Sequence, residues 1–121
     1  MSRYVLLLAY EPWDFTSAGP EVRDYYFAAH RAFEAYVDAH GRRLSGAALG
    51  DTDTATTVRR DAADAVTITD GPFAETTEMI GGYYDVELPD LDSALAAAKL
   101  LPRAYAVEVR PVVGVEGYDA S

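Results

Sequence analysis

The chain has 121 residues, enough for one domain, and half of them are hydrophobic, so a normal core can be buried. Its formal net charge is −10 and its mean hydropathy is close to zero. An acidic surface repels nucleic acid, and no apolar run approaches the roughly 20 residues that cross a bilayer, so neither nucleic acid nor a membrane is an expected partner. Cysteine is absent, which excludes disulfides and thiolate chemistry and makes a cytoplasmic location the expectation.

The first part of the chain predicts a strand followed by a long helix. The run Tyr4–Tyr10 is apolar throughout, as in a central strand that is covered on both faces. Gly19 and Pro20 open the helix, and apolar residues then recur at three- and four-residue steps as far as His40, which gives one buried stripe. Gly41 is a natural stop for this helix.

The remainder predicts further strands, a hairpin and a second helix. β-Branched runs separated by a short acidic segment indicate the hairpin, Asp90 is a good N-cap for the helix, and Pro102 ends it. The expected strands span residues 43–49, 56–59, 65–69, 82–88 and 104–113. Residues 1–113 then form a single domain, and residues 114–121 a loose tail.

This order of elements predicts the fold class. A strand, helix, strand, hairpin, strand, helix and strand suit an α+β, ferredoxin-like split βαβ sheet with an inserted hairpin and both helices on one face. The other face of the sheet then needs cover, and two helices cannot supply it. A second copy packed sheet against sheet is the simplest solution, so the sequence predicts a homodimer.

The most distinctive stretch spans residues 70–82 and reads Asp-Gly-Pro-Phe-Ala-Glu-Thr-Thr-Glu-Met-Ile-Gly-Gly. It resembles the signature of the DGPF group within the YCII-related proteins, and residues 55–59, 89–95 and 106–112 are similar to that family as well. The resemblance covers nearly the whole chain. It implies a dimeric α+β barrel built on the ferredoxin-like fold.

The resemblance also implies a site. The wider YCII-like group is proposed to be enzymatic because a helix histidine and an aspartate meet in a cleft near the dimer interface. His30, eleven positions before Gly41, is the matching histidine, and Asp70, which opens the signature, is the aspartate that we expect to orient it. His30 lies at the border of the apolar stripe, where a half-buried imidazole can act as a general acid or base near neutral pH. The structural alternatives are a histidine that only packs there and a turn formed by Asp70 with Gly71 and Pro72.

Five further residues are candidates for binding a substrate. Tyrosines near strand ends and on the first helix can line a cleft with hydroxyl donors, although most of the nine tyrosines are expected in the core or the dimer interface. The aromatic and acidic residues of the signature can contact a ligand, or simply anchor the loop and face solvent. The candidates are Tyr10, Tyr26, Phe73, Glu75 and Tyr84. Neither a cofactor nor a metal is expected, because the two histidines have no clustered ligand motif around them.

Two functions fit these residues. The first is a small cofactor-independent enzyme in which His30 and Asp70 perform acid–base chemistry on a small organic substrate with a polarised carbonyl. The second is a non-catalytic module that binds a small molecule or regulates a partner. Some proteins of the resembled family occur alongside extracytoplasmic-function sigma factors, which makes a sigma factor a candidate partner. Both functions use the same cleft, so the sequence leaves both open.

Overall fold

The computed structural model describes residues 1–118, which form six strands, two α-helices and two short 3-10 helices. The strands are β1 (Ser2–Tyr10), β2 (Arg42–Ala48), β3 (Thr56–Arg60), β4 (Val66–Asp70), β5 (Met79–Leu88) and β6 (Ala106–Pro111). The helices are η1 (Phe15–Ser17), α1 (Pro20–His40), η2 (Thr52–Thr54) and α2 (Leu91–Ala98). Every predicted strand and α-helix is present, with ends shifted by a few residues. The 3-10 helices have no counterpart in the sequence-based prediction.

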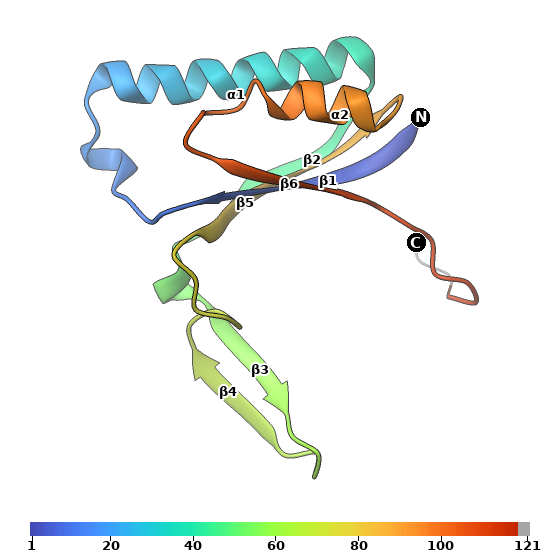
Figure 1. Ribbon diagram of the computed structural model, residues 1–121. Helices are drawn as coiled ribbons and strands as arrows, with labels where there is room; N and C mark the ends of the chain where they lie inside the picture. Colours follow the sequence, from blue (N-terminus) through green and yellow to red (C-terminus); the bar gives the residue numbers. More distant parts are fainter. Residues whose placement is uncertain (119–121) are drawn as a thin grey trace.

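The main sheet confirms the predicted fold class. Its strand order is β2-β5-β1-β6, and all neighbouring strands are antiparallel. Because β5 lies between β1 and β2, the unit β1-α1-β2 is a split βαβ. Both helices cover one face of this sheet (Figure 1). The domain is therefore a ferredoxin-like α+β fold with an inserted hairpin, and the sheet within residues 1–118 is open rather than closed into a barrel.

Helix α1 begins and ends where the sequence predicts. Pro20 occupies its first turn, where a missing backbone N–H has no cost. At the other end the Gly41 N–H donates to the Val37 carbonyl over 2.7 Å. A Cβ at Gly41 would collide with the backbone carbonyl of Glu87 on β5. Only glycine therefore lets the chain pass so closely from α1 into β2.

The core lies between the helices and the sheet. Its buried apolar side chains come from both central strands, from both helices and from the segment after α2: Tyr4, Leu6, Leu8, Phe33, Val37, Val86, Leu88, Ala94, Ala97 and Leu101. Phe33 is fully buried, and its ring centroid lies 4.4 Å from that of Tyr84. Val22, at the start of the expected stripe, is instead 45% exposed, so the buried part of α1 begins later than the pattern indicates.

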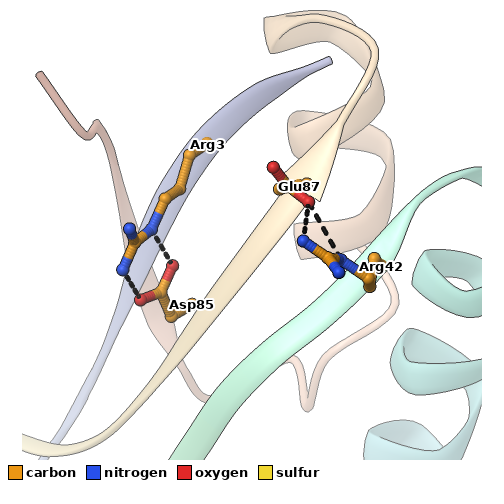
Figure 2. A network of polar contacts seen from close by, with 4 residues as sticks. All are labelled: Arg3, Arg42, Asp85 and Glu87. Atoms are coloured by element: carbon orange, nitrogen blue, oxygen red, sulfur yellow. Dashed lines mark hydrogen bonds and ion pairs between the residues drawn. The ribbon is translucent and has the colours of Figure 1, made fainter. Parts of the chain in front are cut away.

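Within residues 1–118, the opposite face of the sheet has no helix over it (Figure 1) and carries three ion pairs, one of which joins Arg110 to Glu108 of β6. Arg3 of β1 binds both carboxylate oxygens of Asp85 on β5, at 2.9 and 2.7 Å. On the other side of β5, Arg42 of the neighbouring strand β2 binds Glu87 of β5 at 2.7 Å (Figure 2). The alternate apolar side chains of β1 between these charges stay partly exposed. The face therefore combines apolar surface with charges of both signs.

The inserted hairpin is a separate two-stranded sheet of β3 and β4, which projects away from the side of the helices (Figure 1). Its register puts Val58 opposite Ile68 and Arg60 opposite Val66. Val58, Ile68 and Val66 share one face of the hairpin, and they are 63%, 67% and 50% exposed. An isolated two-stranded hairpin is only marginally stable in water, so packing of this apolar face against another surface would stabilise it.

The expected tail is only partly described. A turn joins the Tyr118 N–H to the Val115 carbonyl over 3.0 Å, and residues 119–121 of the tail lie outside the described residues. Across residues 1–118, none of the helices has the length and apolar character needed to cross a membrane.

Candidate functional site

A cavity of about 670 Å³ lies beside α1 and β2, at the end of the sheet where β1 stops and β5 starts. Part of its wall is backbone and small side chains of β2. The polar and aromatic residues on its wall include Tyr10, His30, Glu34, Arg43, Tyr84 and Tyr105. The cavity is large enough for a small organic molecule.

His30 is held at both ring nitrogens by tyrosine hydroxyls. Its Nδ1 lies 2.8 Å from the hydroxyl oxygen of Tyr84 on β5, and its Nε2 lies 2.9 Å from that of Tyr105, just before β6. Helix α1 presents His30 toward the sheet one turn before the buried Phe33. Two elements of the sheet therefore fix the orientation of the imidazole.

Glu34 and Arg43 extend this arrangement to the protein surface. The Tyr84 hydroxyl donates to Glu34 Oε2 over 2.9 Å, and Glu34 lies one helical turn after His30. Arg43 of β2 lies 3.3 Å from the other Glu34 oxygen, and it also binds both carboxylate oxygens of Asp38. The result is a continuous polar chain from a partly exposed ion pair to a half-buried histidine.

Burial is the main cause of the shifted pKa values of His30, Tyr84 and Tyr105. It lowers the pKa of His30 below the usual 6.5, an effect that the charge of Glu34 opposes. Burial also raises the pKa of Tyr105 to about 12, with the neighbouring Tyr10 and Tyr26 adding to the rise. The pKa of Tyr84 is raised further still, first by burial and then by its hydrogen bond to Glu34. At neutral pH the three rings are therefore uncharged.

The lowered pKa of His30 predicts a pH dependence of stability. In the unfolded chain the imidazole takes up a proton near pH 6.5, whereas in the folded chain it does so only at lower pH. The free energy of unfolding is therefore expected to fall as the pH drops from about 7 to about 5, before most carboxylates titrate. Urea unfolding at a series of pH values measures this slope. His30→Gln should flatten it, and an unchanged slope in that variant would contradict the assignment.

Two glycines make room for the tyrosines of the cavity. The pairing of β1 with β5 shifts between Leu8 and Ala9, which leaves Gly81 as the extra residue of a β-bulge. A Cβ at Gly81 would collide with the hydroxyl of Tyr10, and one at Gly46 of β2 would lie 2.7 Å from the ring of Tyr84. The bulge lies at the glycine pair that ends the signature, where the strand bends.

The structure brings three of the predicted site residues together. His30, Tyr10 and Tyr84 all line the main cavity. Tyr26 lines a neighbouring cavity of about 410 Å³, which shares Tyr10 with the first and includes Trp13 of the first loop. The ring of Tyr26 lies between those of Trp13 and Tyr105, at centroid distances of 5.1 and 5.9 Å.

The three predicted site residues of the signature, Asp70, Phe73 and Glu75, line neither cavity. Asp70 is the last residue of β4, exposed to solvent and paired in register with Thr56. Phe73 is 73% exposed on the following loop, and Glu75 is exposed as well. The described residues show no hydrogen bond or ion pair between Asp70 and His30, and within one chain the partners of the histidine are Tyr84 and Tyr105. The predicted contact between Asp70 and His30 is thus not made inside a single chain.

Sequence reasoning missed three members of the site, Glu34, Arg43 and Tyr105. Glu34 had a usable signal, because it lies four positions after His30 and so on the same helix face. The other two come from strand ends that meet α1 only in the folded sheet. As for metals, no group of three or more histidine, aspartate or glutamate side chains in the described part of the chain is arranged to hold an ion.

The fold and the cavity together define a small ferredoxin-like α+β domain with a cavity lined by histidine and tyrosine beside its first helix. The model of the YCII-related domain matches residues 2–116, so the chain belongs to the YCII-related family. The chain is also 40% identical over 81 residues to an uncharacterized protein of Rhizobium meliloti (strain 1021). That similarity spans 64% of this chain and 64% of the relative, so the matched part is just under two thirds of the relative's length.

Proposed function

We propose that this protein is a small cofactor-independent enzyme that uses His30 for acid–base chemistry on a small organic substrate with a polarised carbonyl. The polar chain along the cavity supports the proposal. It holds a half-buried imidazole with fixed hydrogen bonds beside a space of about 670 Å³. A neutral imidazole with a pKa below the usual value can accept a proton at neutral pH and return it within the same turnover.

The other candidate residues take different parts in this proposal. Tyr10 and Tyr84 stand on the wall of the main cavity, where Tyr10 can contact the substrate and Tyr84 orients His30. Tyr26 supports the aromatic wall from the neighbouring cavity. Asp70, Phe73 and Glu75 do not line the main cavity of their own chain, so any role for them in the site requires a second copy.

We propose that this second copy packs on the uncovered face of the sheet. The charges of that face are balanced, with Arg3, Arg42 and Arg110 beside Asp85, Glu87 and Glu108, although the chain as a whole carries −10. A face that meets its own copy across a two-fold axis must not repel itself, and a balanced face satisfies that condition. The β3–β4 hairpin projects from the same side of the sheet, so it extends toward the second copy (Figure 1).

The dimer has a direct test. Size exclusion with light scattering at micromolar concentration should give twice the 13.1 kDa mass of the chain. Val5→Glu puts a charge among the partly exposed apolar side chains of β1 and should yield monomer, whereas Val113→Glu, at a 75% exposed position beyond β6, should not. A monomeric wild-type protein would contradict the proposal, as would a Val5→Glu variant that remains fully dimeric.

The enzymatic proposal is tested by a turnover screen. The purified protein is incubated in heavy water with pools of small carbonyl compounds, and deuterium uptake and new products are followed by NMR and mass spectrometry. Conversion by the wild-type protein and not by His30→Ala supports the enzyme. Thermal stabilisation by a compound that is never converted supports instead the ligand-binding or regulatory module, for which a sigma factor is the candidate partner. Neither conversion nor stabilisation across the pools would contradict both.

A further inference from the structure

The hydrogen bonds around His30 have a definite direction. The carboxylate of Glu34, paired with Arg43, can only accept, so the single proton of the Tyr84 hydroxyl points to Glu34. The Tyr84 oxygen must then accept from His30, which puts the imidazole proton on Nδ1. A neutral imidazole carries one N–H, so Nε2 is an acceptor and receives the proton of the Tyr105 hydroxyl.

This direction makes Tyr105 the donor end of the hydrogen-bonded chain and Glu34 its acceptor end. Both nitrogens of His30 are occupied, so the imidazole cannot meet a ligand in the cavity unless a tyrosine moves away. Tyr105 lines the cavity, and its ring stacks on that of Tyr10 at a centroid distance of 5.1 Å. Among residues 1–118 no group donates a hydrogen bond to the Tyr105 oxygen, so its lone pairs are available to a bound molecule.

We propose that Tyr105 is the catalytic residue that contacts the substrate, and that His30 acts through it as the acceptor of its phenolic proton. This proposal rests on the enzymatic function proposed above and names the group that performs its first step. Glu34 is the positioning residue at the acceptor end of the hydrogen-bonded chain. It fixes the tautomer of His30 through Tyr84 and supplies the negative charge that stabilises an imidazolium.

The step balances as a proton shift on a carbonyl compound with an acidic C–H bond. The substrate proton passes to the Tyr105 oxygen while the phenolic proton of Tyr105 passes to His30 Nε2, and the electron pair of the C–H bond becomes that of an enolate. The imidazolium keeps its Nδ1–H bond to Tyr84. In the return step Tyr105 donates its proton to a different atom of the enolate, and His30 Nε2 returns a proton to the Tyr105 oxygen. This completes an isomerisation, so no oxidant, reductant or further reactant is needed.

The proton acceptor is needed because Tyr105 is a poor base alone. Burial raises the pKa of this phenol to about 12, so almost none of it is ionised at neutral pH. Transfer of its proton to Nε2 in the same step avoids a free phenolate. The reactivity of Tyr105 should therefore follow the protonation of His30 and not the ionisation of a phenol.

The experiment uses p-nitrophenyl acetate as a probe of an activated phenol. The Tyr105 oxygen forms a bond to the acetyl carbon, p-nitrophenolate leaves, and the phenolic proton goes to His30 Nε2 and then to water. Absorbance gives the rate, and mass spectrometry of peptides locates the acetyl group. We expect acetylation at Tyr105, its loss in Tyr105→Phe, and a rate at least about tenfold lower in His30→Gln. Tyr118→Phe, at a 72% exposed position, is the matched control and should leave the rate unchanged.

The pH profile separates this mechanism from a merely structural role of His30. The wild-type rate should be flat between about pH 7 and 9 and fall below the usual histidine value of 6.5, as His30 takes up a proton. In His30→Gln the residual rate should instead rise with pH. Nitrogen NMR of His30 should show Nε2 as the nitrogen without a proton.

Four results would overturn the assignment: no acetylation, acetylation of His30 itself, equal acetylation of all tyrosines, or a wild-type rate in His30→Gln. These outcomes are distinct from failure of the enzymatic function. If a substrate from the screen is converted equally well by Tyr105→Phe, the role of Tyr105 is wrong while the enzyme stands. If Tyr105 is labelled as described but the wild-type protein converts no compound, the enzymatic function fails while the coupling of Tyr105 to His30 stands.

Discussion

Turnover of the substrate is expected to fall by about 10²–10⁴-fold in His30→Ala, the range that a positioned general acid or base contributes. The loss should appear in kcat, because the imidazole takes part in proton transfer in the transition state, whereas the cavity wall that binds the substrate is retained. The fold should survive, since His30 is only half-buried and its two hydrogen-bond partners are hydroxyls at the edge of a cavity that solvent can reach. The ratio of kcat values between variant and wild type on the compound found in the screen is the measurement.

The second histidine provides the control for this prediction. His40 lies at the exposed end of α1, with its Nδ1 2.8 Å from the Tyr36 carbonyl and its ring stacked on Tyr36. It does not line the cavity, so His40→Ala should keep kcat within about twofold of the wild type. Equal loss in both variants would point to unfolding, and full activity in His30→Ala would remove His30 from the mechanism.

Phe33→Ala is expected to lower the free energy of unfolding by about 3–5 kcal/mol, the usual cost of removing a buried phenyl ring. Phe33 is fully buried and packs on Tyr84, so the change leaves an empty space directly beneath the tyrosine that orients His30. That loss is a large share of the roughly 5–15 kcal/mol that holds a typical domain folded. Urea unfolding at a fixed pH measures it, and kcat should fall as well because Tyr84 loses its support.

Phe27 is the matched control for the core prediction. It lies on the same helix and is 48% exposed, with an edge contact to Phe15 of the first loop. Phe27→Ala should cost at most about 1 kcal/mol, as expected of a substitution outside the core. Similar losses for both phenylalanines would mean that the first loop, and not the space between helix and sheet, carries the stability of α1.

The fold was predictable because each of its strands and α-helices has a local signal. The turn residues Gly19 and Pro20 fix the start of α1, and the alternation along β5 puts Val86 in the core and Asp85 on the opposite face, as the structure confirms. The predicted end of α2 was less precise, because the sequence puts it at Pro102 and the helix ends at Ala98. Pro102 disfavours helical geometry at the residue before it, so regular helix ends ahead of the proline itself.

The site was only partly predictable for a physical reason. His30 stands out as one of two histidines, and its position on the helix indicates a half-buried ring. Its actual partners, Tyr84 and Tyr105, lie 54 and 75 positions away and become neighbours only when β5 and the start of β6 pack beneath α1. Tyrosine is also common in this chain, so no single tyrosine is distinctive. The signature drew attention to Asp70, whose exposed place on the hairpin follows from a register that local sequence does not encode.

The two glycines beside the tyrosines set how much room a ligand has. The backbone at Gly81 and Gly46 takes up space that a side chain would otherwise fill, and the rings of Tyr10 and Tyr84 rest against it. A single methyl group at either position would push a tyrosine ring into the cavity. The volume of the cavity therefore depends on the absence of a side chain at Gly81 and Gly46. The size of the substrate is therefore limited by these two glycines as much as by the reactive side chains. Substitutions in β2 or β5 can change which molecules fit while the residues that transfer protons stay the same.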